Sequence, residues 1–73
     1  MSKFEITISL SRNLNRDDEK AVLYLMSQWL VYDARFNHKR SSGEITLFHT
    51  AGAKSDLVRE LAELFPGENM TGM

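Results

Sequence analysis

Apolar and polar residues alternate along the first part of the chain, from Phe4 to Leu10. A period of two, with β-branched residues at the apolar positions, is typical of a strand buried on one face. We therefore predict a strand over residues 4–10, with the side chains of Phe4, Ile6, Ile8 and Leu10 facing the core.

A long apolar helix is predicted next. Asn15 is a good N-cap, and the acidic residues 17–19 fall in the first turn, where negative charge meets the positive end of the helix dipole. Apolar side chains then recur densely from Ala21 to Val31, over too long a stretch for a strand. The main stripe, which we expect to cover the sheet, is Val22, Leu25, Met26, Trp29 and Leu30. Apolar residues outside that stripe need another cover.

The stretch after this helix allows two interpretations. We favour a hairpin in which residues 35–39 pair with residues 44–49, because Arg40-Ser41-Ser42-Gly43 has the composition of a hairpin loop. In the alternative, the helix continues to about Arg40, and its last turn carries the cations of residues 35–40.

A second helix is predicted from Ser55, its expected N-cap, to the stop at Pro66-Gly67. Its apolar stripe is Leu57, Leu61, Leu64 and Phe65. The elements predict an α+β fold, a small two-layer domain of order β-α-β-β-α, or β-α-β-α if the hairpin fails. One small sheet then carries two helices on one face. We expect one globular domain over residues 1–66 and a short flexible tail over residues 67–73.

Composition removes several kinds of site. The chain has no cysteine, which excludes disulfides, thiolate metal sites and thiol catalysis. Its two histidines, His38 and His49, lack carboxylates at ligand spacing, so we expect neither a metal nor a cofactor. The longest apolar stretch is residues 21–26, well short of the roughly 18 residues of a membrane span. We therefore expect a cytoplasmic protein that does not enter a membrane.

Two short stretches carry candidate chemistry. Gly52-Ala53-Lys54-Ser55 lies between a strand and a helix, as a phosphate loop does, but the earlier glycine of that motif is absent. A simple strand-to-helix turn is favoured there, and Lys54 stays a candidate anion contact. The only basic cluster supplies the other candidate contacts for an anion or nucleic acid: Arg35, Phe36, His38, Lys39 and Arg40. A net charge of −1 disfavours a dedicated nucleic-acid binder.

The sequence favours a non-enzymatic protein-interaction module, because it holds no catalytic motif and its first helix carries more apolar residues than one sheet can cover. We expect an accessory or inhibitory protein that docks on a larger bacterial or viral protein, as a homodimer. The predicted interaction residues are Leu23, Tyr24, Val31 and Tyr32. The alternative is a nucleic-acid-associated protein that uses Arg35, Lys39 and Arg40.

Overall fold

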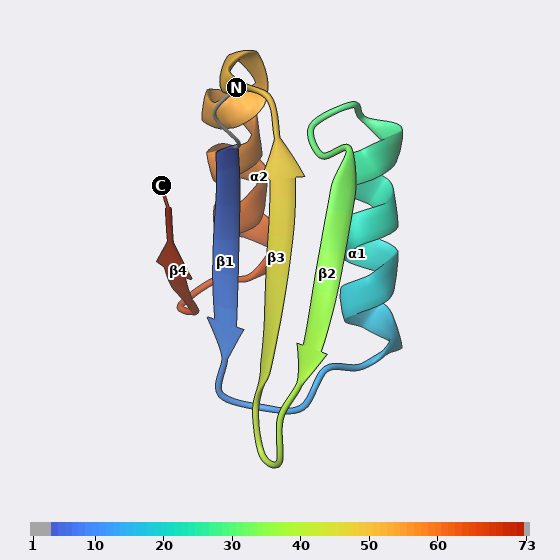
Figure 1. Cartoon of the computed structure of the whole chain (residues 1–73), viewed down its shortest axis with the longest axis vertical. Coiled ribbons are helices and arrows are strands. Elements are labelled where there is room, and N and C mark those ends of the chain that lie inside the picture. Colours follow the sequence, from blue (N-terminus) through green and yellow to red (C-terminus); the bar gives the residue numbers. More distant parts are fainter. Residues whose placement is uncertain (1–3, 73) are drawn as a thin grey trace.

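A four-stranded antiparallel sheet forms one layer of the molecule, as seen in the computed structural model, which describes residues 4–72 (Figure 1). The strands are β1 (Phe4–Leu10), β2 (Asp33–His38), β3 (Gly43–His49) and β4 (Asn69–Thr71). Their order across the sheet is β2-β3-β1-β4, so β2 and β4 are the edge strands.

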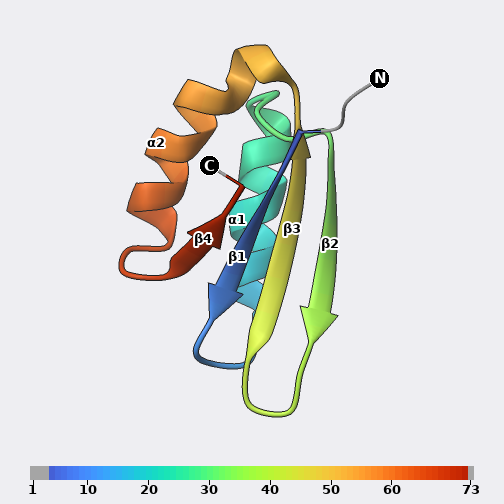
Figure 2. The same ribbon diagram turned by 60° about the vertical axis from the view of Figure 1, so that its left-hand side comes forward.

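Two helices, α1 (Arg16–Ser27) and α2 (Lys54–Leu64), lie together against one face of this sheet (Figures 1 and 2). A short 3₁₀ helix, η1 (Ala51–Ala53), leads from β3 into α2. The resulting order β-α-β-β-α-β, with this strand arrangement, is the split β-α-β topology of ferredoxin-like folds. The predicted α+β class and its two layers are confirmed. Neither helix in the described residues is long and apolar enough to span a bilayer.

The core lies between the sheet and the helices. Alternate residues of β1 and β3 supply one side of it, and one stripe of each helix supplies the other, as the two hydrophobic periods predict. Its fully buried members are Ile6, Ile8, Leu25, Ile45, Leu47, Leu57 and Leu61. The opposite face of the sheet carries mostly polar and charged side chains, with Phe48 among them, and the hydroxyls of Thr7 and Thr46 lie 3.3 Å apart across β1 and β3.

The predicted hairpin between residues 35–39 and 44–49 is confirmed, and the continued helix is wrong. Strands β2 and β3 pair in a register that runs from Asp33 opposite Phe48 to His38 opposite Gly43. Within the loop, the Lys39 N–H donates to the Ser42 carbonyl at 3.0 Å. Gly43 is required where it stands, because the Leu14 side chain occupies the space that a Cβ would need.

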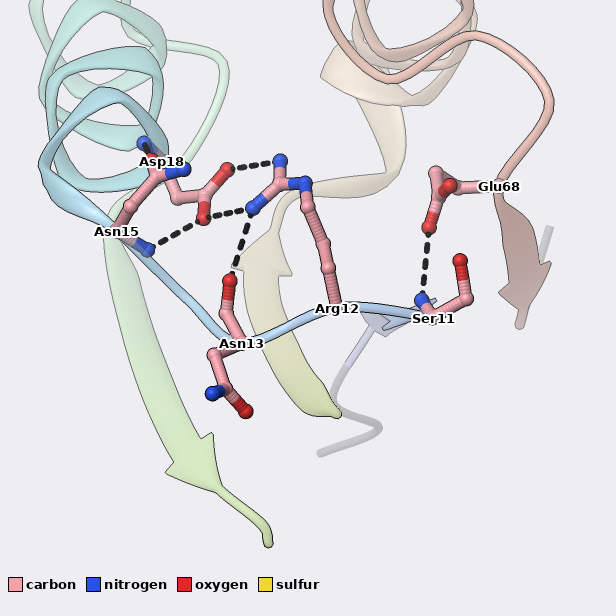
Figure 3. A network of polar contacts seen from close by, with 6 residues as sticks. All are labelled: Ser11, Arg12, Asn13, Asn15, Asp18 and Glu68. Carbon is pink, nitrogen blue, oxygen red and sulfur yellow. Dashed lines mark hydrogen bonds and ion pairs between the residues drawn. The ribbon is translucent and has the colours of Figure 1, made fainter. Parts of the chain in front are cut away.

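A network of side chains fixes the start of α1 (Figure 3). Asn15 and Asp18 form a capping box, in which each side chain accepts a hydrogen bond from the other residue's backbone N–H, at 3.2 and 2.8 Å. The Arg12 guanidinium donates to both oxygens of the buried Asp18 carboxylate, each at 2.8 Å. These Arg12 hydrogen bonds, aided by that of the Asn15 N–H, hold the pKa of Asp18 below its ordinary value, although burial opposes the shift.

The first helix ends earlier than predicted, at Ser27. Trp29 adopts a left-handed backbone conformation (φ 62°), and its N–H donates to the Met26 carbonyl at 3.1 Å. The Leu30 N–H reaches back to the Leu25 carbonyl, also at 3.1 Å. This pair of bonds is a Schellman motif, whose left-handed position glycine usually occupies. The chain therefore leaves the helix at Trp29. Of the two predicted stripe residues beyond Met26, Trp29 is exposed and its prediction is wrong, whereas Leu30 still packs against the core.

The second helix also differs at its start. Ser55 is not the N-cap: α2 begins at Lys54, directly after η1, and its N-cap, Ala53, makes no side-chain cap hydrogen bond. The continuous passage from 3₁₀ to α-helix leaves Ser55 inside the first turn, where it is exposed. The pattern of spacing was right about the helix, and wrong about which residue begins it.

Residues 69–71, which the sequence analysis placed in a tail, form strand β4 on the outer side of β1. They pair with Thr7–Ser9, because β1 has an edge that β3 does not cover. Met70 packs against the core, and the Ser11 N–H donates to Glu68 Oε2 at 3.3 Å (Figure 3). The flexibility expected of residues 67–73 stays a prediction. Residues 1–3 and 73, which the predicted domain and tail include, lie outside the described residues.

Candidate interaction surface

The large apolar side chains left exposed gather on one side of the molecule. Among the described residues there are six, of which five belong to α1, to β2 or to the turn between them, and the sixth, Phe4, starts β1. The five are Leu23, Tyr24, Trp29, Tyr32 and Phe36. Within this set, two adjoining areas differ in shape and backbone setting: one at the end of α1, the other along the outer side of β2.

The aromatic end, which we define as Trp29 and Tyr32, lies in the turn that leads from α1 to β2. The Trp29 side chain is 90% exposed and that of Tyr32 is 60% exposed. Beside them is an open depression of about 310 Å³, lined also by Met26, Leu30 and Thr50. The two projecting rings can pack into another protein, and the apolar depression beside them can accept a side chain of that protein.

The Trp29 side chain does not offset the free-energy cost of its own backbone conformation. The left-handed conformation costs a residue with a Cβ roughly 1–2 kcal/mol, and only glycine adopts it freely. An indole ring that is 90% exposed recovers almost none of that by burial. Trp29 therefore destabilises a position that glycine normally occupies. In this respect it differs from the apolar residues that are scattered over most protein surfaces.

An aromatic and cationic cluster continues from the aromatic end onto the open face of the sheet. The Tyr32 ring lies 6.5 Å from the Phe48 ring, centroid to centroid. The Arg35 guanidinium lies 6.0 Å from the Phe48 centroid, within the range of a cation–π contact. Tyr32 is thereby supported from β3, which limits the entropy that its ring would lose on binding.

The second area, the edge groove, lies between α1 and the outer side of β2. It is an open groove of about 250 Å³, lined by Glu19, Val22, Leu23, Met26, Ala34 and Phe36. The Leu23 side chain is 63% exposed, and Phe36 is also partly exposed. None of the described strands lies beside β2 on this side, so a strand edge runs along the groove.

The structure divides the predicted basic cluster. Arg35 and Phe36 are consecutive strand residues and point to opposite faces of the sheet. Lys39 forms an ion pair with Glu44, and Arg40 follows it in the exposed hairpin loop. Helix α2 begins with Lys54, and the start of this helix lies at the far end of the sheet from that loop (Figure 1).

The open face of the sheet is not a basic surface. It presents Asp33, Glu5 and Glu44 beside Arg35, since these residues share registered positions across β2, β3 and β1. Such a mixture of charges gives little attraction for a phosphate backbone.

The two histidines are in different settings. His38 ends β2 and is exposed, whereas His49 is buried beside Phe4, with ring centroids 6.0 Å apart. His49 Nδ1 lies 2.8 Å from the Thr50 carbonyl oxygen, so Nδ1 carries the proton and donates. Its Nε2 is buried and has no hydrogen-bond partner among residues 4–72. In the part of the chain that the structure describes, no three acidic or histidine side chains are grouped as metal ligands would be.

Of the predicted interaction residues, Leu23, Tyr24 and Tyr32 are exposed, and Val31 is not. Val31 is only 3% exposed and belongs to the core, because the left-handed turn at Trp29 redirects the residues that follow it. Trp29 is exposed instead, which the hydrophobic pattern did not predict. The one available signal was the run of four apolar residues from 29 to 32, which no single helix face can bury.

Comparison with known proteins does not identify a relative of this chain. No protein-family model matches the chain, and a search of curated proteins finds no significant match. Function must therefore be argued from the residues themselves.

Proposed function

We propose that this chain is a non-enzymatic protein-interaction module that docks on a larger protein through its aromatic end, Trp29 and Tyr32. The observation that carries the proposal is the tryptophan at the left-handed position after α1. A fold selected for stability alone would favour glycine there. A tryptophan that is exposed and backbone-strained is instead explained by a contact with another molecule.

The residue types support a protein as the partner. Tryptophan and tyrosine are enriched among the few residues that supply most of the binding energy in protein interfaces. Each presents a large rigid apolar body with one polar group, and the depression beside them offers a place for a partner side chain. Leu23 and Tyr24 extend the apolar area along α1.

The proposed role is accessory or inhibitory, in the cytoplasm of a bacterium or of a cell infected by a virus, with the module acting as a homodimer. Its small size suits a protein that acts by occupying a surface on a larger one. We propose no catalysis, because the buried polar side chains of the described residues, Asp18 and His49, serve a helix cap and a backbone contact.

Affinity capture from the native host with matched baits tests the proposal. The baits are the wild-type chain, the double variant Trp29→Ala with Tyr32→Ala, and Phe4→Ala, which removes an exposed aromatic ring elsewhere. We expect one host protein to be retained by the wild type and by Phe4→Ala and lost with the double variant. With that protein purified, the double variant should weaken Kd at least about 30-fold. Equal affinity of all three baits would contradict the assignment.

The alternative function, nucleic-acid association through Arg35, Lys39 and Arg40, has one observation in its favour. Arg35, Phe48 and Tyr32 form an aromatic and cationic cluster, which is the chemistry on which unstacked bases can lie. The acidic residues of the same face and the net charge of −1 oppose it. Retardation of short DNA or RNA that persists at physiological salt would favour this alternative over protein docking.

A further inference from the structure

The outer edge of β2 offers backbone hydrogen-bonding groups to another strand. Because the Lys39 N–H bonds to Ser42 and antiparallel pairing alternates, the odd-numbered residues of β2 direct their N–H and C=O groups toward β3. Ala34, Phe36 and His38 direct theirs outward. No proline lies within residues 33–38, and Ala34 and Phe36 are the residues that face the groove. The Ala34 N–H already donates to Oδ1 of Asp33 at 2.9 Å, and it would exchange that bond for one to an incoming strand. The edge carries the charged residues Asp33 and Arg35, but no proline and no charge that points inward to prevent pairing.

We propose that a second copy of this chain pairs with the edge, β2 against β2 in antiparallel register, with Phe36 of one copy directly opposite Phe36 of the other. The two sheets then join into one of eight strands with all four helices on one side. This inference rests on the proposed homodimeric module and names the surface that would form the dimer. A two-fold axis normal to the sheet passes between the two Phe36 residues.

Charge complementarity selects this register. Centred on Phe36, it places Asp33 of each copy opposite Lys39 of the other, and Arg35 opposite the neutral Asn37. Lys39, the residue directly after β2, pairs with Glu44 of its own chain, and in the dimer its ammonium would lie between Glu44 and the Asp33 of the other copy. Sliding the strands so that the axis passes Arg35 would put two arginines directly opposite each other. Sliding them the other way, to Asn37, would put Arg35 opposite Lys39. Like charges directly opposite are destabilising in a sheet.

A register centred on Ala34 also avoids like charges, but it uses less of the strand. It leaves Asn37 and His38 opposite residues that precede β2 and are not in a strand. The register centred on Phe36 instead engages the outward-facing groups of Ala34, Phe36 and His38 in each copy. It is the longest ladder that the strand permits without a repulsive pair.

The apolar side chains of the edge groove lie where this dimer would cover them. Phe36 and Leu23 border the groove on the helix side of β2, and α1 runs along that strand (Figures 1 and 2). Across the two-fold axis, the two grooves face each other, so Phe36 and Leu23 of each copy contact those of the other. Strand β4, the opposite edge, has only three residues and offers a much shorter ladder.

Cysteine cross-linking tests the register, because the chain has no cysteine of its own. In a Phe36→Cys variant, the two Cα atoms would lie about 5.5 Å apart, within disulfide range. In Ala34→Cys they would lie about 13 Å apart, too far to bridge. We expect oxidation to cross-link Phe36→Cys and not Ala34→Cys, and a mixture of Ala34→Cys with His38→Cys to cross-link as a heterodimer. Cross-linking of Ala34→Cys with itself would overturn the register.

Sedimentation equilibrium of the unmodified chain at 10–500 µM, concentrations on the order of typical weak dimers, tests the dimer without any variant. A mass approaching twice the 8.4 kDa of one chain is expected. Asp33→Lys and Lys39→Asp should each dimerise about tenfold more weakly than the wild type, because like charges then face each other. An equimolar mixture of the two variants should regain wild-type affinity, since each lysine of one copy then faces an aspartate of the other. A single 8.4 kDa species across the range would overturn the proposal.

These outcomes separate the dimer from target docking. Trp29→Ala with Tyr32→Ala leaves β2 intact and should dimerise as the wild type does. Asp33→Lys leaves the aromatic end intact, so it should still be retained by the captured protein in monomeric form. If the chain were monomeric alone yet bound its target through the β2 edge, Asp33→Lys would weaken that binding, and the occupant would be a strand of the target instead of a second copy.

Discussion

The two helices lie on the same face of one sheet and have nearly the same length, yet they divide their residues differently. In α2, the apolar residues Leu57 and Leu61 are fully buried, and the outer positions carry charged side chains such as Arg59 and Glu63. In α1, Leu25 is fully buried in the same way, but Leu23 stays exposed on the outer side. The sheet has room for one stripe from each helix, so the additional apolar residues of α1 are not needed for folding.

The ends of the helices show the same contrast. The start of α1 is fixed by a capping box and by Arg12, whereas its end carries a strained, exposed tryptophan. A helix end that served folding alone would carry glycine at that position. The comparison indicates that α2 and the start of α1 maintain the fold, while the end of α1 and the adjoining β2 leave large apolar side chains exposed.

The largest expected effect is a cavity under α2. Leu61→Ala should lower the free energy of unfolding by about 2–5 kcal/mol, because the side chain is fully buried. The matched change on α1, Leu23→Ala, should alter it by less than about 0.5 kcal/mol, since that side chain is largely exposed. Thermal melts of both variants provide the measurement. Similar losses for the two leucines would remove the distinction between the helices.

The next effect is at the start of α1. Asp18→Asn should lower the free energy of unfolding at pH 7 by about 1–3 kcal/mol, because a buried, doubly hydrogen-bonded carboxylate loses its charge. Asp17→Asn, an exposed neighbour in the same helix turn, is the control.

The pH dependence of this effect has a defined sign. The pKa of Asp18 is lower in the folded state than its ordinary value of 3.8. The stability that it contributes is therefore complete above about pH 5 and is lost as the pH falls below 4 toward the folded-state pKa. Urea denaturation at pH 7 and pH 3 measures how much the free energy of unfolding falls between the two pH values. This fall should be smaller for Asp18→Asn than for the wild type. An unchanged acid dependence would mean that the Arg12 contact does not persist in solution.

A gain in stability is expected at the end of α1. Trp29→Gly should raise the free energy of unfolding by up to about 1 kcal/mol, because glycine adopts the left-handed conformation without strain. The same variant should lose affinity for the captured target protein. A melt and a binding titration on one sample check both, and a clear loss of stability would show that Trp29 supports the fold after all.

The smallest effect is expected on the other face of β2. Replacing Arg35, Lys39 and Arg40 together by glutamine should change the free energy of unfolding by less than about 1 kcal/mol, because exposed charges and a partly exposed ion pair such as Lys39–Glu44 contribute little. Chemical denaturation of the triple variant measures this. Failure to fold would place these residues in a structural network.

Local patterns were sufficient to predict most of the elements. The alternation from Phe4 to Leu10 has the period of a strand, and the spacing of Leu57 and Leu61 has the period of a helix. The Asn15 cap and the hairpin before Gly43 follow from residues that are neighbours in the chain. In each case the interacting residues are close together in the sequence, so local composition and spacing indicate the element.

The candidate surface could be predicted only in part. Leu23, Tyr24 and Tyr32 were expected outside the core, because one sheet covers one helix face. Trp29 and Val31 were exchanged, because the helix ends without the glycine that normally marks a Schellman motif. Once the chain turns at Trp29, the helical period no longer says which side chain points inward.

The sequence by itself determined the two-layer α+β class and the start of α1, since these depend on the periods of strands and helices and on neighbouring side chains. It favoured the hairpin over a longer helix without excluding the helix, and the pairing of β2 with β3 decided between the two. Only the tertiary structure decided that Asn69–Thr71 form a strand, because their partners, Thr7–Ser9, are about sixty residues away and the segment has no alternation of its own. Gly72 allows that approach, since a Cβ there would collide with the Glu5 carbonyl oxygen. The tertiary structure also decided which apolar residues of α1 stay exposed. This helix has apolar residues on several faces, and the sheet is wide enough to cover only one of them.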